Sequence, residues 1–133
     1  MPGPANSERM ADGVGVVFSP GGKVYSFDPG ELELAWNDKV ICETSRGREF
    51  GRVVQPNHTI PAEELTGRLK RVVRLASEAD EERVRDNRQE ARRAMLAFRE
   101  LIRVHELAIK PISAELVFDG SRLVLSYGAE GKV

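Results

Sequence analysis

The chain has one cysteine, Cys42, among its 133 residues. A single thiol excludes an internal disulfide, and it excludes a zinc or iron–sulfur site built only from cysteines of this chain. Cys42 lies in the apolar, β-branched run Val40–Thr44, where a small buried side chain is favoured over a redox-active one. Because an unpaired cysteine is typical of a reducing compartment, we predict a cytoplasmic location.

Histidine is also scarce, and the usual catalytic motifs are missing. His58 and His105 are the two histidines, and neither has a companion four residues away, as a helical metal site needs. We expect His105 to lie in or beside an apolar helix stripe, and His58 to lie in a solvated loop. No G-x-S-x-G, P-loop or G-x-G-x-x-G motif is present. The sequence therefore predicts no catalytic, cofactor-binding or metal-binding residue, and a protein that is not an enzyme.

Neither charge nor hydropathy is strongly biased. Lysine and arginine number 20 against 21 acidic residues, so no net field draws the chain toward nucleic acid or an anionic membrane. No segment approaches the roughly 20 apolar residues of a membrane-spanning helix. Residues 1–12 lack the apolar core of a signal peptide, and we predict that they form a flexible leader.

Residues 13–56 contain short apolar runs separated by turn residues, the pattern of a compact antiparallel sheet. Apolar residues alternate along Val14–Phe18, and Asp28-Pro29-Gly30 is typical of a tight turn. About five short strands in so short a segment favour a small SH3-like β-barrel, which protects its edges. We predict that residues 55–61 are a linker, because the two prolines there cannot donate to a strand ladder.

Residues 57–133 are predicted to form a long α-helix, from about Ser77 to Leu107, followed by a β-hairpin around Asp119-Gly120-Ser121. The later half of the helix has a broad apolar stripe, made of Ala91, Ala94, Met95, Phe98, Leu101 and Ile102. We expect the hairpin to pack on this stripe. The polar first half of the helix should project into solvent, carry charge pairs or meet another polar surface. The predicted class is α+β.

Six basic residues are the candidates for contact with a partner or a nucleic acid. Four precede the helix and two lie on it: Arg68, Lys70, Arg71, Arg74, Arg88 and Arg92. Such side chains bind phosphates, but the intervening acidic residues weaken their field and no aromatic residue is interleaved for base stacking. A solvated basic face is therefore favoured. Trp36 and Tyr25 are large enough to anchor either a core or an interface, and periodicity does not decide between the two.

Several segments in a fixed order carry a family resemblance. They are residues 22–28 (GKVYSFD), 38–44 (DKVICET), 46–54 (RGREFGRVV), 74–80 (RLASEAD) and 114–123 (AELVFDGSRL). Together they resemble the bacterial YaaT/RicT family, whose members carry the polymerase-suppressor (PSP-type) domain. The resemblance spans nearly the whole chain after the leader.

The resemblance implies a cytoplasmic, non-enzymatic regulatory scaffold subunit. Such a subunit assembles with two small helical proteins, YlbF and YmcA, and modulates messenger-RNA processing by ribonuclease Y, with effects on sporulation. The residues themselves leave a second hypothesis open. In that alternative, an SH3-like barrel and the basic cluster before the helix form a nucleic-acid-binding module.

The family pattern continues after the hairpin with another helix, a strand and a cysteine-rich motif, and its members are linked to iron–sulfur clusters. The sequence stops at Val133, so we expect residues 57–133 to be a truncated PSP-type domain. No cofactor is expected in this chain, because the cluster would need the cysteines of that further motif. An incomplete domain would expose a hairpin edge and an apolar patch, which favours a homodimer through that edge.

Overall fold

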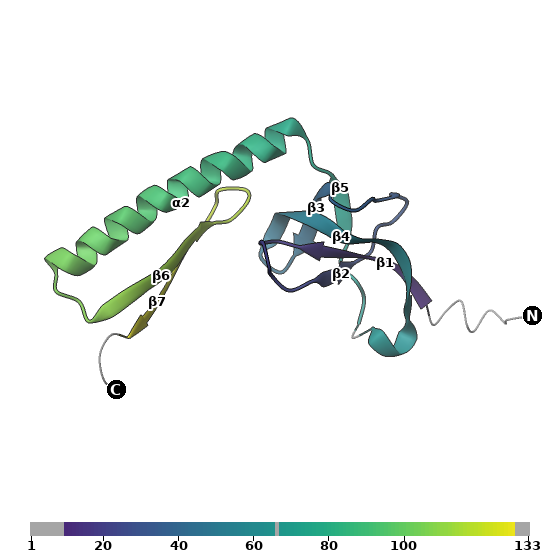
Figure 1. Ribbon diagram of the computed structural model, residues 1–133, viewed down its shortest axis with the longest axis horizontal. Coiled ribbons are helices and arrows are strands. Elements are labelled where there is room, and N and C mark those ends of the chain that lie inside the picture. The colour runs from purple at the N-terminus through teal and green to yellow at the C-terminus, as the bar shows by residue number, and fades with distance from the viewer. Residues whose placement is uncertain (1–9, 66, 130–133) are drawn as a thin grey trace, which may run out of the picture. The chain divides into compact units, whose positions relative to one another are not determined.

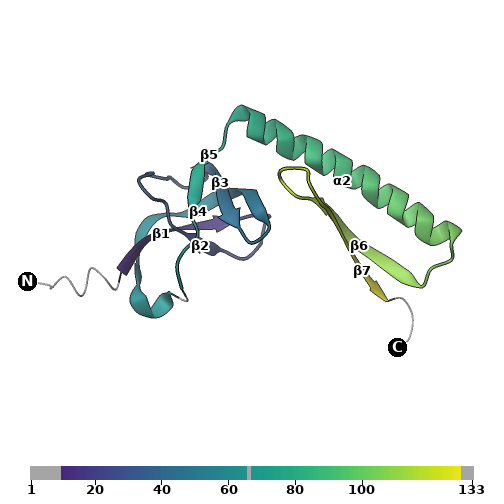
Figure 2. The ribbon, with the colours of Figure 1, turned by 180° about the vertical axis from the view of Figure 1, so that it is seen from behind.

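The computed structural model describes residues 10–65 and 67–129. Within them the chain forms two compact units, unit 1 up to Ser77 and unit 2 from Glu78 (Figures 1 and 2). Unit 1 contains five strands and a short 3-10 helix: β1 (Met10–Val17), β2 (Tyr25–Phe27), β3 (Lys39–Thr44), β4 (Gly47–Pro61), η1 (Ala62–Glu64) and β5 (Val72–Leu75). Unit 2 contains one helix and two strands: α2 (Glu78–Val104), β6 (Ile109–Leu116) and β7 (Leu123–Ala129). The predicted α+β class is confirmed.

The strands of unit 1 form one antiparallel sheet in the order β2-β1-β4-β3-β5. Apolar side chains that alternate along these strands collect in one core, because successive residues of a strand point to opposite faces. The core consists of Val14, Val16, Phe27, Leu34, Val40, Cys42, Val53 and Val72. Phe18 packs against this cluster, with its ring edge-to-face on Phe27 at a centroid distance of 5.7 Å.

The two outer strands of this sheet approach each other at one point. Asp28, just after β2, forms an isolated parallel bridge with Arg71, just before β5. Asp28 N–H donates to the Lys70 carbonyl at 2.8 Å, and Val72 N–H donates to the Asp28 carbonyl at 2.9 Å. Backbone groups that would otherwise be free at both edges are satisfied there, which protects the edges.

We predicted that residues 55–61 form a linker, and this is wrong. They are the end of the 15-residue strand β4. The register against β1 shifts between Gly13 and Gly15, so Pro56 lies at an irregularity of the strand pairing. There, the absence of a backbone N–H donor costs little stability. Asn57 holds the preceding loop in place. Its side-chain oxygen accepts from Leu34 N–H at 2.7 Å, and its side-chain amide donates to the Leu32 carbonyl at 2.8 Å.

In unit 2, α2 lies alongside the β6–β7 hairpin (Figures 1 and 2). The predicted turn is confirmed: Gly120 has φ +77°, and Gly120 N–H donates to the Val117 carbonyl at 2.7 Å. Ser121 N–H donates to the Asp119 carboxylate at 2.9 Å, and the hydrogen bonds from Ser121 lower the pKa of Asp119. Ala91 of the helix and Val117 of the hairpin are buried.

Most side chains in the polar first half of α2 are exposed to solvent, but two of them meet the hairpin turn. Asn87 donates from its side-chain amide to the Phe118 carbonyl at 2.9 Å, and the Arg83 guanidinium lies 5.7 Å from the centre of the Phe118 ring. Further along, Phe98 meets Tyr127 edge-to-face at 6.2 Å. The hairpin therefore follows both halves of the helix, while Leu101, expected in the buried stripe, is 54% exposed.

The end of α2 has a Schellman geometry. Leu107 N–H donates to the Ile102 carbonyl at 3.0 Å, and Glu106 N–H donates to the Arg103 carbonyl at 3.3 Å. Glu106 adopts the left-handed conformation that this motif requires, with φ +49°. The chain then turns back into β6 without the glycine that usually fills this position.

Candidate functional site

The cysteine and the histidines are not assembled into a reactive centre. Cys42 is fully buried in the core, as predicted, and burial first and Glu49 second raise the pKa of its thiol to about 12. His58 is exposed on β4 rather than in a loop, and its Nδ1 lies 2.8 Å from the Pro56 carbonyl oxygen. His105 is exposed just after α2, not part of an apolar stripe. Within residues 10–65 and 67–129, no cluster of His, Cys, Asp or Glu is suited to hold a metal ion.

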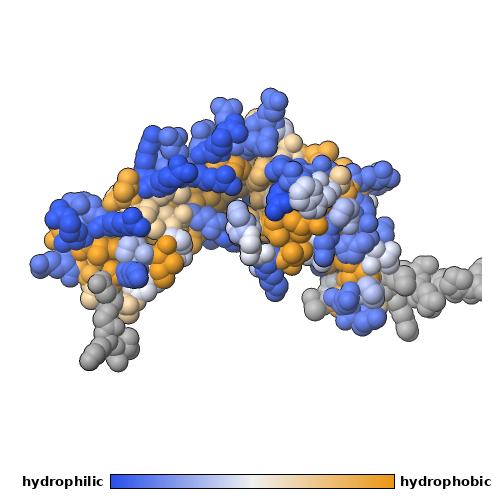
Figure 3. Space-filling view, in the orientation of Figure 1, coloured by the Kyte–Doolittle hydropathy of each residue, from blue (hydrophilic) through white to orange (hydrophobic). Residues whose placement is uncertain are grey.

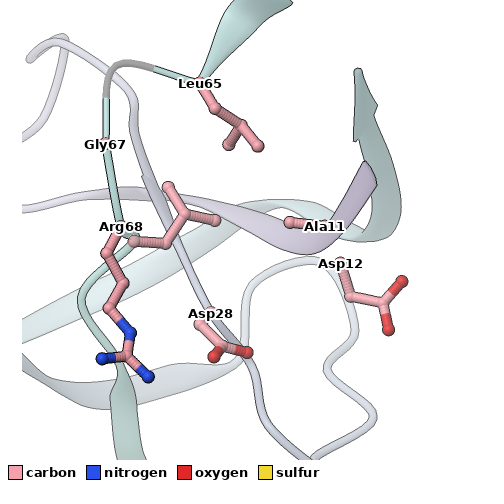
Figure 4. A pocket seen from close by; sticks show the side chains of 7 residues that line it. Ala11, Asp12, Asp28, Leu65, Gly67 and Arg68 are labelled. Atoms are coloured by element: carbon pink, nitrogen blue, oxygen red, sulfur yellow. The ribbon is translucent and has the colours of Figure 1, made fainter. Parts of the chain in front are cut away.

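The four predicted basic residues before the helix have different surroundings. Arg68 lines an open pocket of about 270 Å³ together with Asp12 and Asp28. Figure 4 shows that Leu65 points into this space, while the Arg68 and Asp28 side chains extend from opposite segments at its rim. Asp12 and Asp28 bring negative charge to the pocket that Arg68 lines, so the positive potential around Arg68 is reduced.

The other three members of this cluster flank or belong to β5. Arg71 forms an ion pair with Glu43, with a separation of 3.7 Å between Nη2 and Oε1. Arg74 donates from Nη1 to the Leu75 carbonyl at 3.3 Å, and Lys70 is exposed. An exposed ion pair of this kind contributes little to stability, but it does partly neutralise the surface around it.

Arg88 and Arg92 are both exposed on α2. Figure 3 shows strongly hydrophilic side chains along the outer edge of this helix. The structure thus divides the six predicted residues between unit 1 and unit 2.

The sequence did not decide whether the two large aromatic residues Trp36 and Tyr25 lie in a core or on the surface, and the structure does. Trp36 is 64% exposed and Tyr25 is 48% exposed, so neither is a core residue. The Arg52 guanidinium lies 5.9 Å from the centre of the Trp36 ring, and the Lys23 ammonium lies 5.5 Å from that of Tyr25. A cation therefore lies near each ring, while both rings remain exposed to solvent.

Exposed apolar side chains are concentrated in unit 2. From the sequence we expected such side chains on the hairpin but not on the helix. We call the following residues the apolar surface of unit 2: Leu101, Val104, Leu107, Ile112, Leu123 and Tyr127. One helix and a two-stranded sheet cover each other only in part, and even Tyr127, which meets Phe98 of the helix, is 61% exposed. Exposed apolar groups gathered on one small unit are typical of interaction sites. The helix pattern did contain a signal for this exposure, because Leu101 lies at the edge of the predicted apolar stripe and Val104 lies outside it.

No helix in the described part of the chain combines the length and the apolarity needed to cross a membrane.

Comparison with known proteins shows a match to one family model and sequence similarity to a curated protein. Residues 70–133 match the model of the PSP1 C-terminal conserved region. This region starts before β5, so it includes one strand of the unit 1 sheet as well as all of unit 2. The chain is also 33% identical over 124 residues to "Stage 0 sporulation protein YaaT" of Bacillus subtilis (strain 168). The match covers 93% of this chain and 45% of that relative, so the chain spans less than half of its length. No solved structure matches the chain at a significant level.

Proposed function

The chain belongs to the YaaT family of PSP1-domain proteins, and we propose that it is a non-enzymatic regulatory subunit that acts by binding other proteins. Its partners are helical proteins of the YlbF and YmcA type. The assembly modulates messenger-RNA processing that depends on ribonuclease Y, as the resemblance to YaaT/RicT implies, and it works in the cytoplasm, where the unpaired Cys42 is compatible with reducing conditions.

The apolar surface of unit 2 is the observation that carries this proposal. Leu101 and Val104 on α2 and Ile112 on β6 are all more than half exposed. Burying side chains of this size against a partner contributes about 1.5–3 kcal/mol for each one that is fully covered. A helical partner that covers several of them gains enough to offset the cost of association.

Unit 1 serves as the framework of this subunit. We assign its sheet to a small barrel of the SH3 type, supported by the bridge between Asp28 and Arg71 that joins the two outer strands. The outer edges of β6 and β7 offer a second mode of association, because neither is paired within the described residues. Two copies of the chain would pair through this edge to form a homodimer.

Size-exclusion chromatography of the chain with YlbF- and YmcA-type proteins tests the proposal. We expect co-elution with at least one of them, and light scattering on the chain alone reports the homodimer. The double variant Leu101→Ser with Ile112→Ser should lose co-elution, whereas the matched control Val24→Ser, an exposed apolar residue of unit 1, should keep it. Absence of a complex with the wild-type chain would contradict the proposed partners.

The nucleic-acid alternative has weaker support. Arg71 pairs with Glu43, and Arg68 shares its pocket with two aspartates, so these guanidinium groups are less available to phosphates. Fluorescence anisotropy with labelled RNA at low salt separates the two functions, because binding through phosphates weakens steeply as salt is added.

A further inference from the structure

One side of α2 carries a row of arginines that form no ion pair or hydrogen bond with the described residues. We call Arg85, Arg88, Arg92, Leu96 and Arg99 the arginine stripe. They recur at intervals of three, four, four and three residues. At 100° per residue, these intervals keep all five within a sector of about 80°, over a length of about 21 Å. All five side chains are exposed.

The arginines of the stripe differ from the other arginines of the helix. Arg83 lies over the Phe118 ring, Arg93 pairs with Glu90 at 3.6 Å, and Arg103 binds Glu100 through two hydrogen bonds. By contrast, the four arginines of the stripe have no ion pair or hydrogen bond with any residue in 10–65 or 67–129. Their binding capacity is therefore available to a partner.

The helix also separates charges that alternate in the sequence. Asp86 and Glu90 stand between the arginines in the chain, but their positions on the helix lie outside the sector of the stripe. The row next to the stripe includes Glu82 and Glu100. The surface is thus a positive row about one side chain wide, with carboxylates along one border and the apolar Val84 and Met95 along the other.

We propose that the arginine stripe binds an acidic helix of a partner protein. This inference rests on the proposed function and names the kind of partner surface that α2 accepts. A helix laid along α2 presents its own side chains at intervals of three and four residues, so a row of glutamates matches the guanidinium groups over several turns. Arginine is suited to this role because its planar fork binds a carboxylate through two parallel hydrogen bonds.

Leu96 favours a protein over a nucleic acid as the occupant. It lies within the stripe, with arginines on both sides along the helix, and is 65% exposed. An apolar centre surrounded by charges is the usual anatomy of a protein interface. A phosphate backbone gains little from Leu96 and would pass the bordering carboxylates, and no aromatic residue of the stripe offers a base-stacking surface. The net charge of −1 also provides no general attraction for a polyanion.

The test measures the affinity of the full chain for defined probes by fluorescence anisotropy. The first probe is a labelled, end-capped helical peptide of about 20 residues, with glutamates at intervals of three and four and one central leucine. The second is the same peptide with glutamine in place of each glutamate. Single-stranded and double-stranded RNA of about 20 nucleotides are the third and fourth probes.

Two triple variants with the same net charge distinguish an effect of the arginine stripe from an effect of the total charge of the protein. The first combines Arg88→Gln, Arg92→Gln and Arg99→Gln in the stripe. The control combines Arg48→Gln, Arg93→Gln and Arg122→Gln, which are exposed arginines outside it. Both variants should keep the circular dichroism spectrum of the wild-type chain, because glutamine and arginine have similar helix propensities.

We expect the acidic peptide to bind the wild-type chain and the control variant within about twofold of each other, and the stripe variant at least about tenfold more weakly. The glutamine peptide should bind none of them measurably. Equal affinity of both triple variants for the acidic peptide, or no binding by the wild-type chain, would overturn the proposal. RNA binding that only the stripe variant loses would overturn it too, by identifying the row as a phosphate site.

A chromatographic arm keeps this inference separate from the proposed function. If the wild-type chain and the stripe variant co-elute equally with YlbF- and YmcA-type proteins, the proposed function stands and the stripe has no part in it, which counts against the inference. If the wild-type chain forms no such complex, the proposed partners fail, while the peptide experiment still decides the role of the stripe.

Discussion

The side-chain amide of Asn87 donates a hydrogen bond to the Phe118 carbonyl oxygen, 2.9 Å away, and lies 3.4 Å from the Val117 carbonyl oxygen. The Val117 carbonyl already accepts from Gly120 N–H within the turn, so the Asn87 amide matters most for the Phe118 carbonyl. One polar side chain thereby attaches the hydrophilic half of α2 to the hairpin turn.

Replacing this amide should destabilise unit 2. Asn87→Ala removes the donor and leaves part-buried carbonyl oxygens without it, which costs about 1–3 kcal/mol. Urea unfolding followed by circular dichroism at the helix band measures the change. Gln89→Ala, an exposed position of the same helix, is the control and should change stability by less than about 0.5 kcal/mol. Equal stability of the two variants would show that the hydrogen bond does not hold the hairpin.

Glycine at the end of α2 should stabilise the protein. Glu106 has φ +49°, a conformation that glycine adopts without the steric cost of a Cβ atom, so Glu106→Gly should raise the free energy of unfolding by about 0.5–1 kcal/mol. Thermal unfolding reports this as a higher midpoint. The contrasting variant Ala97→Gly, at an exposed position inside the helix, should lower stability by about 1 kcal/mol. A lower midpoint for Glu106→Gly would contradict the left-handed geometry at the helix end.

Cys42 should be unreactive in the folded chain. Burial raises the pKa of its thiol from 9.0 to about 12, so the nucleophilic thiolate is almost absent at pH 8. A thiol reagent such as iodoacetamide should modify the protein only as denaturant unfolds it. Rapid modification of the native chain would contradict the burial of this side chain.

The same group makes stability depend on alkaline pH. The unfolded chain releases the thiol proton near pH 9.0, but the folded chain holds it to about pH 12, so this contribution to stability is complete below pH 9.0 and declines as pH rises toward 12. Urea midpoints measured at pH 8 and pH 10.5 should show the decline. Cys42→Ala should reduce that pH dependence, and an unchanged dependence would assign it to other groups.

Replacing Gly51 with a larger residue should destabilise unit 1. A Cβ atom there would lie 2.5 Å from Val16 Cγ1 and 2.9 Å from the Phe18 ring, so Gly51→Ala forces core side chains to move and should cost about 1–3 kcal/mol. Chemical denaturation monitors the loss. At Gly128 the same atom would meet Ile112 Cδ1 at an ordinary 3.6 Å, so Gly128→Ala should cost clearly less. The reverse order would show that unit 1 repacks freely around Gly51.

Local signals in the sequence were sufficient for several elements. The Asp119-Gly120-Ser121 turn is confirmed because its geometry depends on the positive φ of Gly120 and on the Asp119 carboxylate, both of which are local. The apolar alternation around Val14 and Val16 likewise placed these residues in the core. Segment 55–61 was misassigned because proline disfavours a strand only where its missing donor is needed, and the register shift that removes that need depends on β1.

The surfaces depended more on the fold. From the sequence we identified Arg88 and Arg92 as candidates but treated nearby acids as cancelling them, because we did not place each charge by its angle around the helix. It also left the exposure of Trp36 undecided, because burial depends on neighbours contributed by other strands.

By itself, the sequence determined the α+β class, the helix, the hairpin turn, a single cysteine without a partner, and the resemblance to a family. These follow from backbone preferences and periodicity, which act over a few residues. Only the tertiary structure decided which polar residue ties the helix to the hairpin, which aromatic and apolar side chains remain exposed, and which arginines of α2 are left without a partner. Those properties depend on contacts between segments far apart in the chain, which periodicity does not encode.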